Sequence, residues 1–379
     1  MDFSSHTPVV GGPFQPVGKV VRGRDARASN KALVLQCLHD QPDLSRAEVA
    51  RLTGLTRAGV SDIVAGLVAD QLVAETGRAD NARAGKPGTM LAISDSRDIV
   101  ALDLSAPDQV VGAIHSMRGA SRQTVALPLG GATGQGAVGL LCELIDRLLN
   151  LASHPVLGIG VGTPGTVNAT GVVLASRRFG WRDLALQDIL ADRFGLSVAV
   201  INDANAATVA EQAFADGPAD LLRVQMALGV GAGLLLGGQV VLGTSAAAGE
   251  IGHIVVERAG QKCLCGKRGC LETWASTPAL ARRIAVDPTR RDAVLAEGGR
   301  RLGMALVPVL AMLDINDVVL GGPPVLVSGP FARAAQNLIN ERVRSEFRDA
   351  VRLRASTLGD DATMLGAVAM VMRTTLGVW

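Results

Sequence analysis

The sequence has no tyrosine and few aromatic residues of any kind, with seven Phe and three Trp among 379 residues. Its cores must therefore be built mainly from Leu, Val, Ile and Ala. Charged residues make up only 19% of the chain against 48% hydrophobic ones, a balance typical of a folded protein and not of a disordered one. The formal net charge is +2, so any attraction to nucleic acid must come from a local group of basic residues.

The sequence also has no recognisable targeting or membrane segment. Residues 1–18 lack the basic and apolar regions of a secretory signal, and we expect them to be a flexible N-terminus. The longest stretch without a charge, 224–249, is interrupted by several glycines, which favours strand, glycine turn and strand over a spanning helix. We therefore expect a cytoplasmic protein that does not associate with membranes. Its length predicts two or three cores.

The segment 19–94 has the pattern of a winged helix-turn-helix, a DNA-binding domain. An apolar repeat at helical spacing starts near Ser29, and Ser29 or Asn30 is available as its N-cap. Residues 45–48, Ser-Arg-Ala-Glu, predict a capping box that opens a second helix, which ends at a tight turn containing Gly54. Thr56 can cap a third helix. The apolar face predicted for that helix consists of Val60, Ile63, Leu67 and Val68.

A basic loop, 77–88, follows the third helix between two predicted strands, 72–75 and 90–93. The loop carries three basic residues against one acid, which predicts a wing that contacts phosphates or the minor groove. The third helix is expected to enter the major groove with its N-terminal end. The predicted DNA-binding residues are Arg57 and Ser61 on this helix and Arg78, Arg83 and Lys86 in the wing.

The basic character of this region is modest. Between Lys19 and Lys86 there are eleven Lys or Arg and eight Asp or Glu, an excess of three. Phosphate contacts add up over two half-sites, so we expect a homodimer or homotetramer on a double-stranded DNA operator. A short polar hinge, 94–97, is predicted to join this domain to the rest of the chain.

Three of the five cysteines lie within eight residues, and a histidine precedes them. His253, Cys263, Cys265 and Cys270 supply one imidazole and three thiolates, a closed tetrahedral set that suits a structural zinc ion. We therefore predict a zinc loop over 253–272. The other two cysteines, Cys37 and Cys142, each lie in an apolar helical pattern and are predicted to be inert thiols.

The residues around this cluster resemble the ROK family of repressors, open reading frames and kinases. The motif runs from Gly249-Glu250-Ile251-Gly252-His253 through Cys-x-Cys-Gly-x-x-Gly-Cys-x-Glu to Glu272. Residues 162–165, Gly-Thr-Pro-Gly, and 200–207 are similar to further motifs of the family, and the resemblance covers about 99–371. It implies an α/β chain whose part 98–379 has a ribonuclease-H-like, actin-like sugar-kinase fold, with two lobes and a ligand cleft between them.

The same residues fit a sugar. A sugar ring presents hydroxyls, so its site needs carboxylates and amides as paired acceptors and donors. Asp203 and Glu250 each lie in an otherwise uncharged stretch, which favours a binding role over a solvated surface acid. With one ring nitrogen on zinc, His253 has the other free for a hydroxyl. The predicted sugar-binding residues are Asn202, Asp203, Glu250, His253 and Glu272.

The phosphate loops depart from the kinase pattern that the resemblance implies. In kinases of this family a residue in the place of Asp203 is the general base, and the first phosphate loop is of the Asp-x-Gly-Gly-Thr type. Here 103–108 reads Asp-Leu-Ser-Ala-Pro-Asp, with a proline that has no amide hydrogen and a second negative charge. The second loop reads Ala-Leu-Gly-Val-Gly at 227–231, where the family pattern is Gly-Thr-Gly-x-Gly. The third loop reads Gly-Gly-Pro at 321–323, where the family pattern is Gly-Gly-Gly.

These observations predict a repressor of sugar metabolism without enzymatic activity, in which Asp203 is a vestigial base. Its DNA affinity would change when a sugar or sugar phosphate binds in the cleft. An active ATP-dependent sugar kinase with an appended DNA-binding domain is the alternative. A third hypothesis is that partner proteins, and not sugars, bind the regulator's surface.

Overall fold

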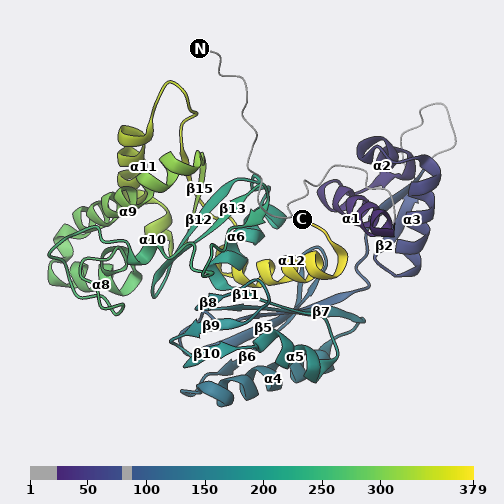
Figure 1. Cartoon of the computed structure of the whole chain (residues 1–379), viewed down its shortest axis with the longest axis horizontal. Coiled ribbons are helices and arrows are strands. Elements are labelled where there is room, and N and C mark those ends of the chain that lie inside the picture. Colours follow the sequence, from purple (N-terminus) through teal and green to yellow (C-terminus); the bar gives the residue numbers. More distant parts are fainter. Residues whose placement is uncertain (1–23, 79–87) are drawn as a thin grey trace, which may run out of the picture.

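The computed structural model describes residues 24–78 and 88–379. They form a small helical domain at the N-terminal end and two α/β lobes (Figure 1). The predicted flexible segment 1–18 and the predicted wing residues Arg83 and Lys86 lie outside the described residues. In the described part no single helix is long and apolar enough to cross a membrane, and the one pair that passes this test together, the second and third helices, is bent by 116°.

The small domain packs three helices against a three-stranded antiparallel sheet of order β1-β3-β2. Its elements are α1 (Arg24–Asp40), β1 (Leu44–Ser45), α2 (Arg46–Thr53), α3 (Arg57–Ala69), β2 (Val73–Arg78) and β3 (Thr89–Ile93). The predicted capping box is confirmed: the Glu48 amide donates to Ser45 Oγ, and the Ser45 amide donates to the Glu48 carboxylate at 2.8 Å. Gly54 adopts φ 71° at the end of α2, as the predicted turn requires.

Two sequence predictions for this domain are wrong. Ser29 and Asn30 lie inside α1 and do not cap it, because the helix already begins at Arg24, and Ala26 in its first turns is buried. On α3 the buried stripe is Val60, Val64 and Leu67, whereas Val68 is 36% exposed. At 100° per residue Val68 lies further round the helix from Val60 than Val64 does, so it turns toward solvent.

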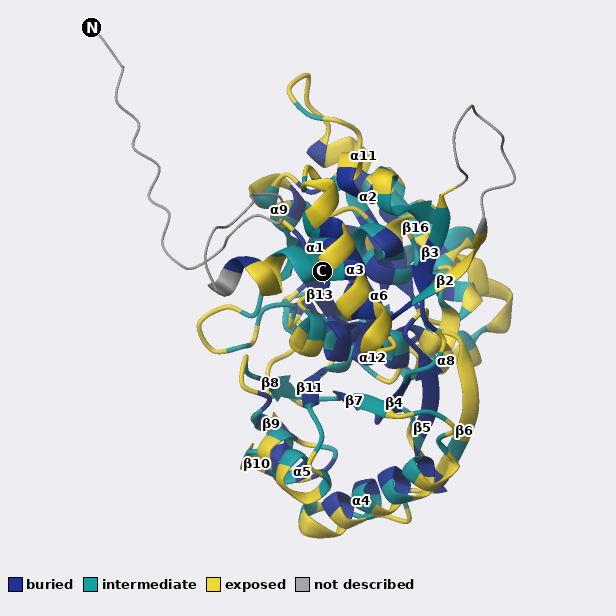
Figure 2. Ribbon diagram, turned by 90° about the vertical axis from the view of Figure 1, so that its right-hand side faces the viewer, coloured by how far each residue is buried: buried dark blue, intermediate teal, exposed yellow. Residues whose placement is uncertain are grey.

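The first lobe is built on a five-stranded mixed sheet of order β11-β7-β4-β5-β6. Helices α4 and α5 cover one face, and α12 lies on the other (Figure 2). A small antiparallel sheet of β8, β9 and β10 lies beside it. The elements are β4 (Asp98–Asp103), β5 (Gln109–Ser116), β6 (Ser121–Pro128), α4 (Gly134–Leu151), β7 (Val156–Thr163), β8 (Thr166–Val167), β9 (Val173–Ser176), β10 (Trp181–Leu184), α5 (Leu186–Phe194) and β11 (Val198–Asn202).

The second lobe repeats the design with a sheet of order β14-β13-β12-β15-β16. Helix α6 covers one face, and an apolar core joins the other face to a layer of helices. The stretch 224–249 contains strands and turns, as predicted. The elements are α6 (Asp203–Phe214), β12 (Leu221–Met226), β13 (Val230–Leu236), β14 (Gln239–Val240), α7 (Glu272–Ala275), α8 (Thr277–Val286), α9 (Arg291–Leu313), β15 (Asp317–Gly321), α10 (Pro324–Val327), α11 (Gly329–Val343) and β16 (Arg352–Ala355), with 3-10 turns at Ile251–His253, Pro288–Arg290 and Gly359–Asp361.

Helices α6 and α12 (Ala362–Leu376) pack against each other between the two sheets. Helix α12 follows the glycines of β7: a Cβ at Gly158, Gly160 or Gly162 would meet Val371, Ala367 or Thr363. Four helical residues rise about 6 Å and two strand residues about 6.6 Å, so the two repeats nearly match. Where the helices cross, a Cβ on Gly366 would overlap the backbone carbonyl of Ala206. The lobes are therefore joined by helices whose backbones touch.

We expect Gly366→Ala to destabilise the chain by about 1–3 kcal/mol, because the added methyl group forces the two helix backbones apart. Gly139→Ala is the matched control. Gly139 also lies inside a helix, but its notional Cβ has open space, so alanine there should stabilise by about 0.5–1 kcal/mol. The midpoints of thermal and urea unfolding measure both effects. A Gly366→Ala chain as stable as the wild type would contradict the close packing.

Candidate functional site

The four residues of the predicted metal cluster come together in one loop. Their ligand atoms, the ring nitrogens or sulfurs of His253, Cys263, Cys265 and Cys270, all lie within 4.8 Å of one another. Tight turns make this convergence feasible: Gly266 has φ 95° and Gly269 has φ 72°, and a Cβ on Gly269 would overlap the Glu257 carbonyl. The cluster can therefore hold a metal ion.

The distances fit tetrahedral coordination. Cys263 Sγ lies 3.6 Å from His253 Nδ1, and Cys265 Sγ lies 3.6 Å from Cys270 Sγ. With metal–sulfur bonds of about 2.3 Å, two ligands on a tetrahedron are separated by about 3.8 Å. The opposite ring nitrogen, His253 Nε2, lies 3.8 Å from Glu250 Oε2. The imidazole thus presents Nδ1 to the thiols and Nε2 to a carboxylate of the predicted sugar set.

Asp203 lies where strand β11 of the first lobe ends and helix α6 begins. Strand β11 ends at Asn202, whose Oδ1 caps α6 by accepting from the Asn205 amide at 3.0 Å. The Asn202 side-chain amide donates to Gly165 O and to Asp203 Oδ1, each at 2.9 Å. Asp203 Oδ1 also accepts from the Ala204 amide at 2.8 Å. Asn202 therefore fixes the orientation of Asp203, and within the described residues these bonds leave Asp203 Oδ2 for a ligand.

Burial raises the pKa of Asp203 to about 6, and the nearby carboxylate of Asp103 contributes in the same direction. The side chain lies deep in the protein while part of its surface stays accessible. The pKa of Asp103 is also raised by burial, against the effects of Ser105 and Arg178. Two neighbouring carboxyl groups with raised pKa values are typical of a functional site.

The other predicted sugar residues, Glu250, His253 and Glu272, lie around the metal cluster on the second lobe. The Ala232 amide on β13 donates to Gly249 O at 2.8 Å, directly before Glu250. The neighbouring Gly231 faces Ala204, the residue after Asp203, at 3.7 Å from its notional Cβ. The carboxylate of Glu272 lies 3.9 Å from Cys263 Sγ and against Gly229 in the turn before β13. Strand β13 and the turn before it therefore contact both the residue after Asp203 and Glu272 beside the metal cluster.

Sequence reasoning missed two arginines in the turn after β9. Arg178 donates to the carbonyls of Leu104, at 2.8 Å, and Ala106, within the segment predicted as a degenerate phosphate loop. Burial lowers the pKa of this guanidinium, while Asp103, Asp203 and Asp108 raise it. Arg177 donates to Leu264 O at 3.0 Å and so joins the first lobe to the metal loop. An Arg-Arg pair beside Phe179 and Trp181 was the available signal in the sequence.

Three of the predicted DNA-binding residues, Arg57, Ser61 and Arg78, lie within the described part of the chain. Arg57 and Ser61 are exposed on the first turns of α3, the helix that follows the Gly54 turn. Arg78 ends β2, at the edge of the wing segment. Together with α2 and the sheet, this arrangement can present one helix end to a DNA groove.

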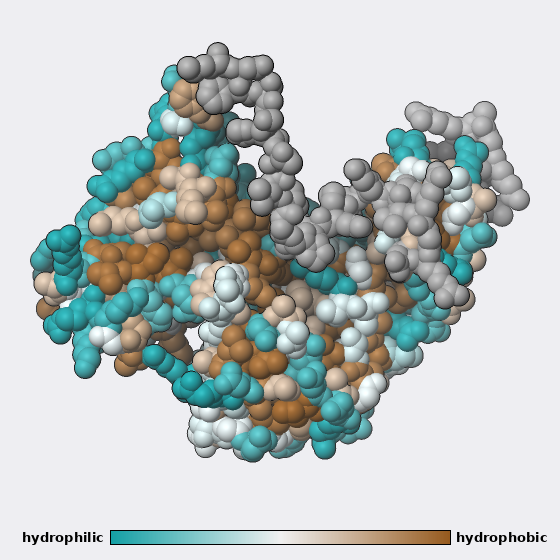
Figure 3. Space-filling model, in the orientation of Figure 1, coloured by the Kyte–Doolittle hydropathy of each residue, from teal (hydrophilic) through white to brown (hydrophobic). Residues whose placement is uncertain are grey.

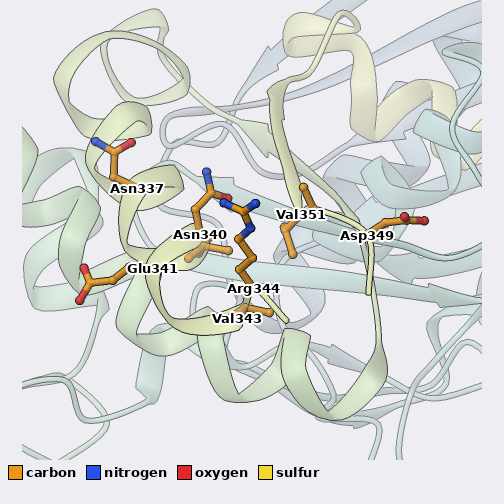
Figure 4. A pocket seen from close by; sticks show the side chains of 9 residues that line it. Asn337, Asn340, Glu341, Val343, Arg344, Asp349 and Val351 are labelled. Atoms are coloured by element: carbon orange, nitrogen blue, oxygen red, sulfur yellow. The ribbon is translucent and has the colours of Figure 1, made fainter. Parts of the chain in front are cut away.

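A hollow of about 460 Å³ lies at the end of α11 and the start of the loop that follows it. Figure 4 shows polar side chains around it, among them Asn340, Glu341, Arg344 and Asp349. Among the described residues, none of those predicted to bind metal, sugar or DNA lines this hollow. It is therefore separate from the candidate site.

The ROK family model matches residues 132–374. The chain belongs to the ROK family. This confirms the resemblance and the fold that it implied. The xylose repressor of Caldicellulosiruptor bescii is 27% identical over 385 residues, which covers 90% of this chain and 95% of that protein. The glucokinase of Streptomyces coelicolor is 34% identical over 255 residues, which covers 56% of this chain and 80% of the glucokinase.

Solved structures show the same architecture. A ROK family transcriptional regulator, described as a homolog of the E. coli MLC protein, matches with a TM-score of 0.81 at 22% identity and covers 93% of this chain and 97% of its own. The ROK hexokinase from Thermus thermophilus matches with a TM-score of 0.62 at 28% identity, and the match covers 73% of this chain and 99% of the hexokinase. The regulator's match thus extends over the helical domain, whereas the hexokinase's match has the extent of the two lobes.

We expect the purified chain to carry about one metal ion, because four soft ligands form a closed tetrahedron. Cys265→Ser removes one thiolate and should lower the metal content well below one per chain. Cys142→Ser is the control, since Cys142 is a half-buried thiol outside the cluster. Mass spectrometric metal analysis measures both. Full metal content in Cys265→Ser, or none in the wild type, would contradict the assignment.

Proposed function

We propose that this ROK-family protein is a transcriptional repressor whose affinity for operator DNA changes when a sugar binds between its lobes. The observation that carries the proposal is the combination, in one chain, of a helix-turn-helix, a buried carboxyl at the start of α6 and a metal cluster flanked by two further carboxylates. The relatives matched over most of the chain are named xylose repressors, whereas the glucokinases match little more than half of it. The proposed division is a DNA-binding domain over 19–94 and an effector domain over 98–379.

The DNA side rests on α3. Arg57 and Ser61 would contact base edges or phosphates in the major groove, and Arg78, Arg83 and Lys86 would add wing contacts to phosphates. The partner is a double-stranded operator. Residues Val286, Met312 and Phe347 are 85–88% exposed, all on the second lobe, where Figure 3 shows hydrophobic surface. Such exposed apolar residues support a homodimer or homotetramer, which would place two helix-turn-helix units on paired half-sites.

The sugar side rests on Asp203, Glu250, His253 and Glu272 as hydroxyl ligands, with Asn202 orienting Asp203. Zinc is the metal that one imidazole and three thiolates suit best, and four protein ligands leave it no open position for catalysis. Its role would be structural: it would hold the imidazole so that Nε2 faces Glu250 and the sugar. D-xylose is the first candidate effector because of the relatives' names, and a sugar phosphate is the second.

The segment 103–108 supports a regulator without kinase activity. A nucleotide phosphate bound there would meet the carboxylates of Asp103 and Asp108, and the nearby guanidinium of Arg178 already donates to the loop carbonyls. The glycines that remain after residue 227 have a packing role. A Cβ on Gly233 would overlap Thr208 Oγ1 on α6, and one on Gly229 would crowd Glu272. Asp203 would then be kept as a hydroxyl acceptor and not as a base.

Sugar affinity should rise between pH 5 and pH 7.5, because the ionised form of Asp203 accepts a sugar hydroxyl and its pKa is about 6. One unit below that pKa only about a tenth of the carboxyl is ionised, so binding should weaken about tenfold at pH 5. Asp203→Asn should bind sugar weakly at every pH. Calorimetric titration with D-xylose measures this. Equal affinity of the wild type at both pH values would contradict the role of Asp203.

The same substitution should stabilise the fold at pH 7.5. Because the folded-state pKa of Asp203 lies above the ordinary value of 3.8, its contribution to stability is full below pH 3.8 and is lost as the pH rises through about 6. The neutral amide removes this loss, so Asp203→Asn should unfold at a higher temperature than the wild type at pH 7.5. At pH 3.5, where Asp203 is protonated, this advantage should be absent.

The function is tested with a DNA duplex recovered by the purified chain from a random-sequence library. Fluorescence anisotropy should show that D-xylose, D-glucose or one of their phosphate esters changes the affinity for this duplex. A coupled assay for ADP should show that no ATP is consumed with these sugars. Arg57→Ala should weaken DNA binding about tenfold or more without changing sugar affinity. Arg147→Ala, an exposed arginine of α4, is the control. Failure to recover a specific duplex, together with sugar-dependent ATP consumption, would favour the kinase.

A further inference from the structure

Helix α6 connects the candidate sugar site to the DNA-binding domain. Its first residue is Asp203 and its last is Phe214, so its twelve residues span about 18 Å. Nearly every side chain between these two is buried, including all of 204–211. Because a close-packed interior is hardly compressible, α6 moves as one body, and a displacement at Asp203 is transmitted to Phe214.

At its far end α6 contacts the DNA-binding domain through three aromatic rings. The ring centroids of Phe214 and His39, from α1, lie 5.8 Å apart, and those of Phe214 and Trp379 also lie 5.8 Å apart. His39 and Trp379 meet edge to face at 4.5 Å. The Trp379 amide donates to Gln36 Oε1, also on α1, at 2.8 Å. We call the rings of His39, Phe214 and Trp379 the aromatic joint.

Trp379 lies three residues after the end of α12. The C-terminal ends of both α6 and α12 therefore reach the aromatic joint. Arg373 of α12 donates to the main-chain oxygen of Trp379 at 2.9 Å and to Gly238 O at 2.7 Å, which fixes 377–379 to the second lobe. Gly377 allows the turn at φ 71° and lies against Ala32 of α1. The ends of α6 and α12 therefore both contact α1, beside an apolar core that the helical domain shares with the first lobe.

Helices α6 and α12 are each tied to a different lobe. Glu211, fully buried in the last turns of α6, forms ion pairs with Arg223 of β12 at 3.2 Å and with Arg354 of β16 at 3.5 Å. Helix α12 lies on β7 of the first lobe and touches α6 at Gly366. A change in the angle between the lobes must therefore shift α6 against α12, and their ends define the position of α1.

The joint has room to respond. Its three side chains are half-buried, and Phe214 and Trp379 lie at the edge of an apolar core. A hollow of about 220 Å³ lies beside them, lined by Leu38, His39 and Pro42 of the helical domain and by Arg118, Phe214 and Asp216 of the lobes. The rings of His39 and Phe214, which line this space, can reorient into it when α6 moves, whereas a filled core would resist.

We propose that the aromatic joint transmits the state of the sugar site to the DNA-binding domain. This inference rests on the proposed function and names its route. A sugar held between Asp203 on one side and Glu250 and Glu272 on the other sets the angle of the lobes. The shifted ends of α6 and α12 then move α1, and with it α3, relative to the lobes. Two half-sites are read only at one spacing, so this movement changes operator affinity.

The test compares operator affinity without sugar and with saturating sugar, for which D-xylose and D-glucose are used in turn with the selected duplex. The variants are Phe214→Ala and Trp379→Ala. Phe194→Ala is the matched control, because Phe194 is also a half-buried phenylalanine but lies on α5, outside the joint. Wild type and control should show a sugar-dependent change in operator affinity of about 5- to 150-fold, the range usual for coupled sites.

Both joint variants should reduce this ratio to less than about twofold, because the two sites then act independently. Their sugar affinity and their sugar-free operator affinity should stay within about threefold of the wild type, and circular dichroism should show the same helix content. Joint variants that keep the wild-type ratio would overturn the inference while leaving the proposed function intact. A wild-type chain that ignores both sugars and their phosphate esters would overturn the proposed function itself.

Discussion

The contact between α6 and α12 is the constraint on which the architecture depends. Each helix covers the sheet of a different lobe, and the two touch where Gly366 leaves no space before the Ala206 carbonyl. The glycines of β7 bring α12 equally close to the first sheet. With no side chains between these backbones, the lobes cannot slide independently, and relative motion is confined to a small change of crossing angle. This restriction turns a pair of α/β lobes into a hinge with defined ends.

The candidate sites lie at the ends of this hinge. Asp203 begins α6, and its carboxyl is desolvated because the helix is buried almost throughout. The metal cluster lies beside Glu272, and His253 turns its second ring nitrogen toward Glu250. Arg177 donates to Leu264 O, so one polar contact already joins the first lobe to the metal loop. At the opposite end, the helical domain contacts the lobes through the joint.

Local patterns in the sequence predicted local structure well. The capping box of Ser45 and Glu48, the turn at Gly54 and the metal loop are each set by residues within about twenty positions of one another, so their spacing was sufficient. The helix α1 was predicted to start too late because the first turns depend on burial of Ala26, which is a tertiary effect. The two-lobed fold came from the family motifs and not from periodicity.

Long-range features could not be predicted in the same way. His39 and Trp379 are 340 positions apart, and neither stands in a motif. Arg178 reaches a loop more than seventy positions earlier, and only the folded chain brings them together. The alternating glycines at 158, 160 and 162 indicate that something approaches β7 closely, but they do not identify it as α12. Sequence patterns thus located the ends of the hinge, and the tertiary structure was needed to find what connects them.

The central claim is that sugar binding and DNA binding are coupled through the angle between the two lobes. Thermodynamic linkage tests this coupling most directly. If sugar weakens operator binding by a given factor, a saturating operator must weaken sugar binding by the same factor. Calorimetric titration of D-xylose into the free chain and into its operator complex measures this factor independently of the anisotropy data. Equal factors from the two measurements are predicted. A sugar affinity that is unchanged by bound DNA, in a chain that binds both, would contradict the account.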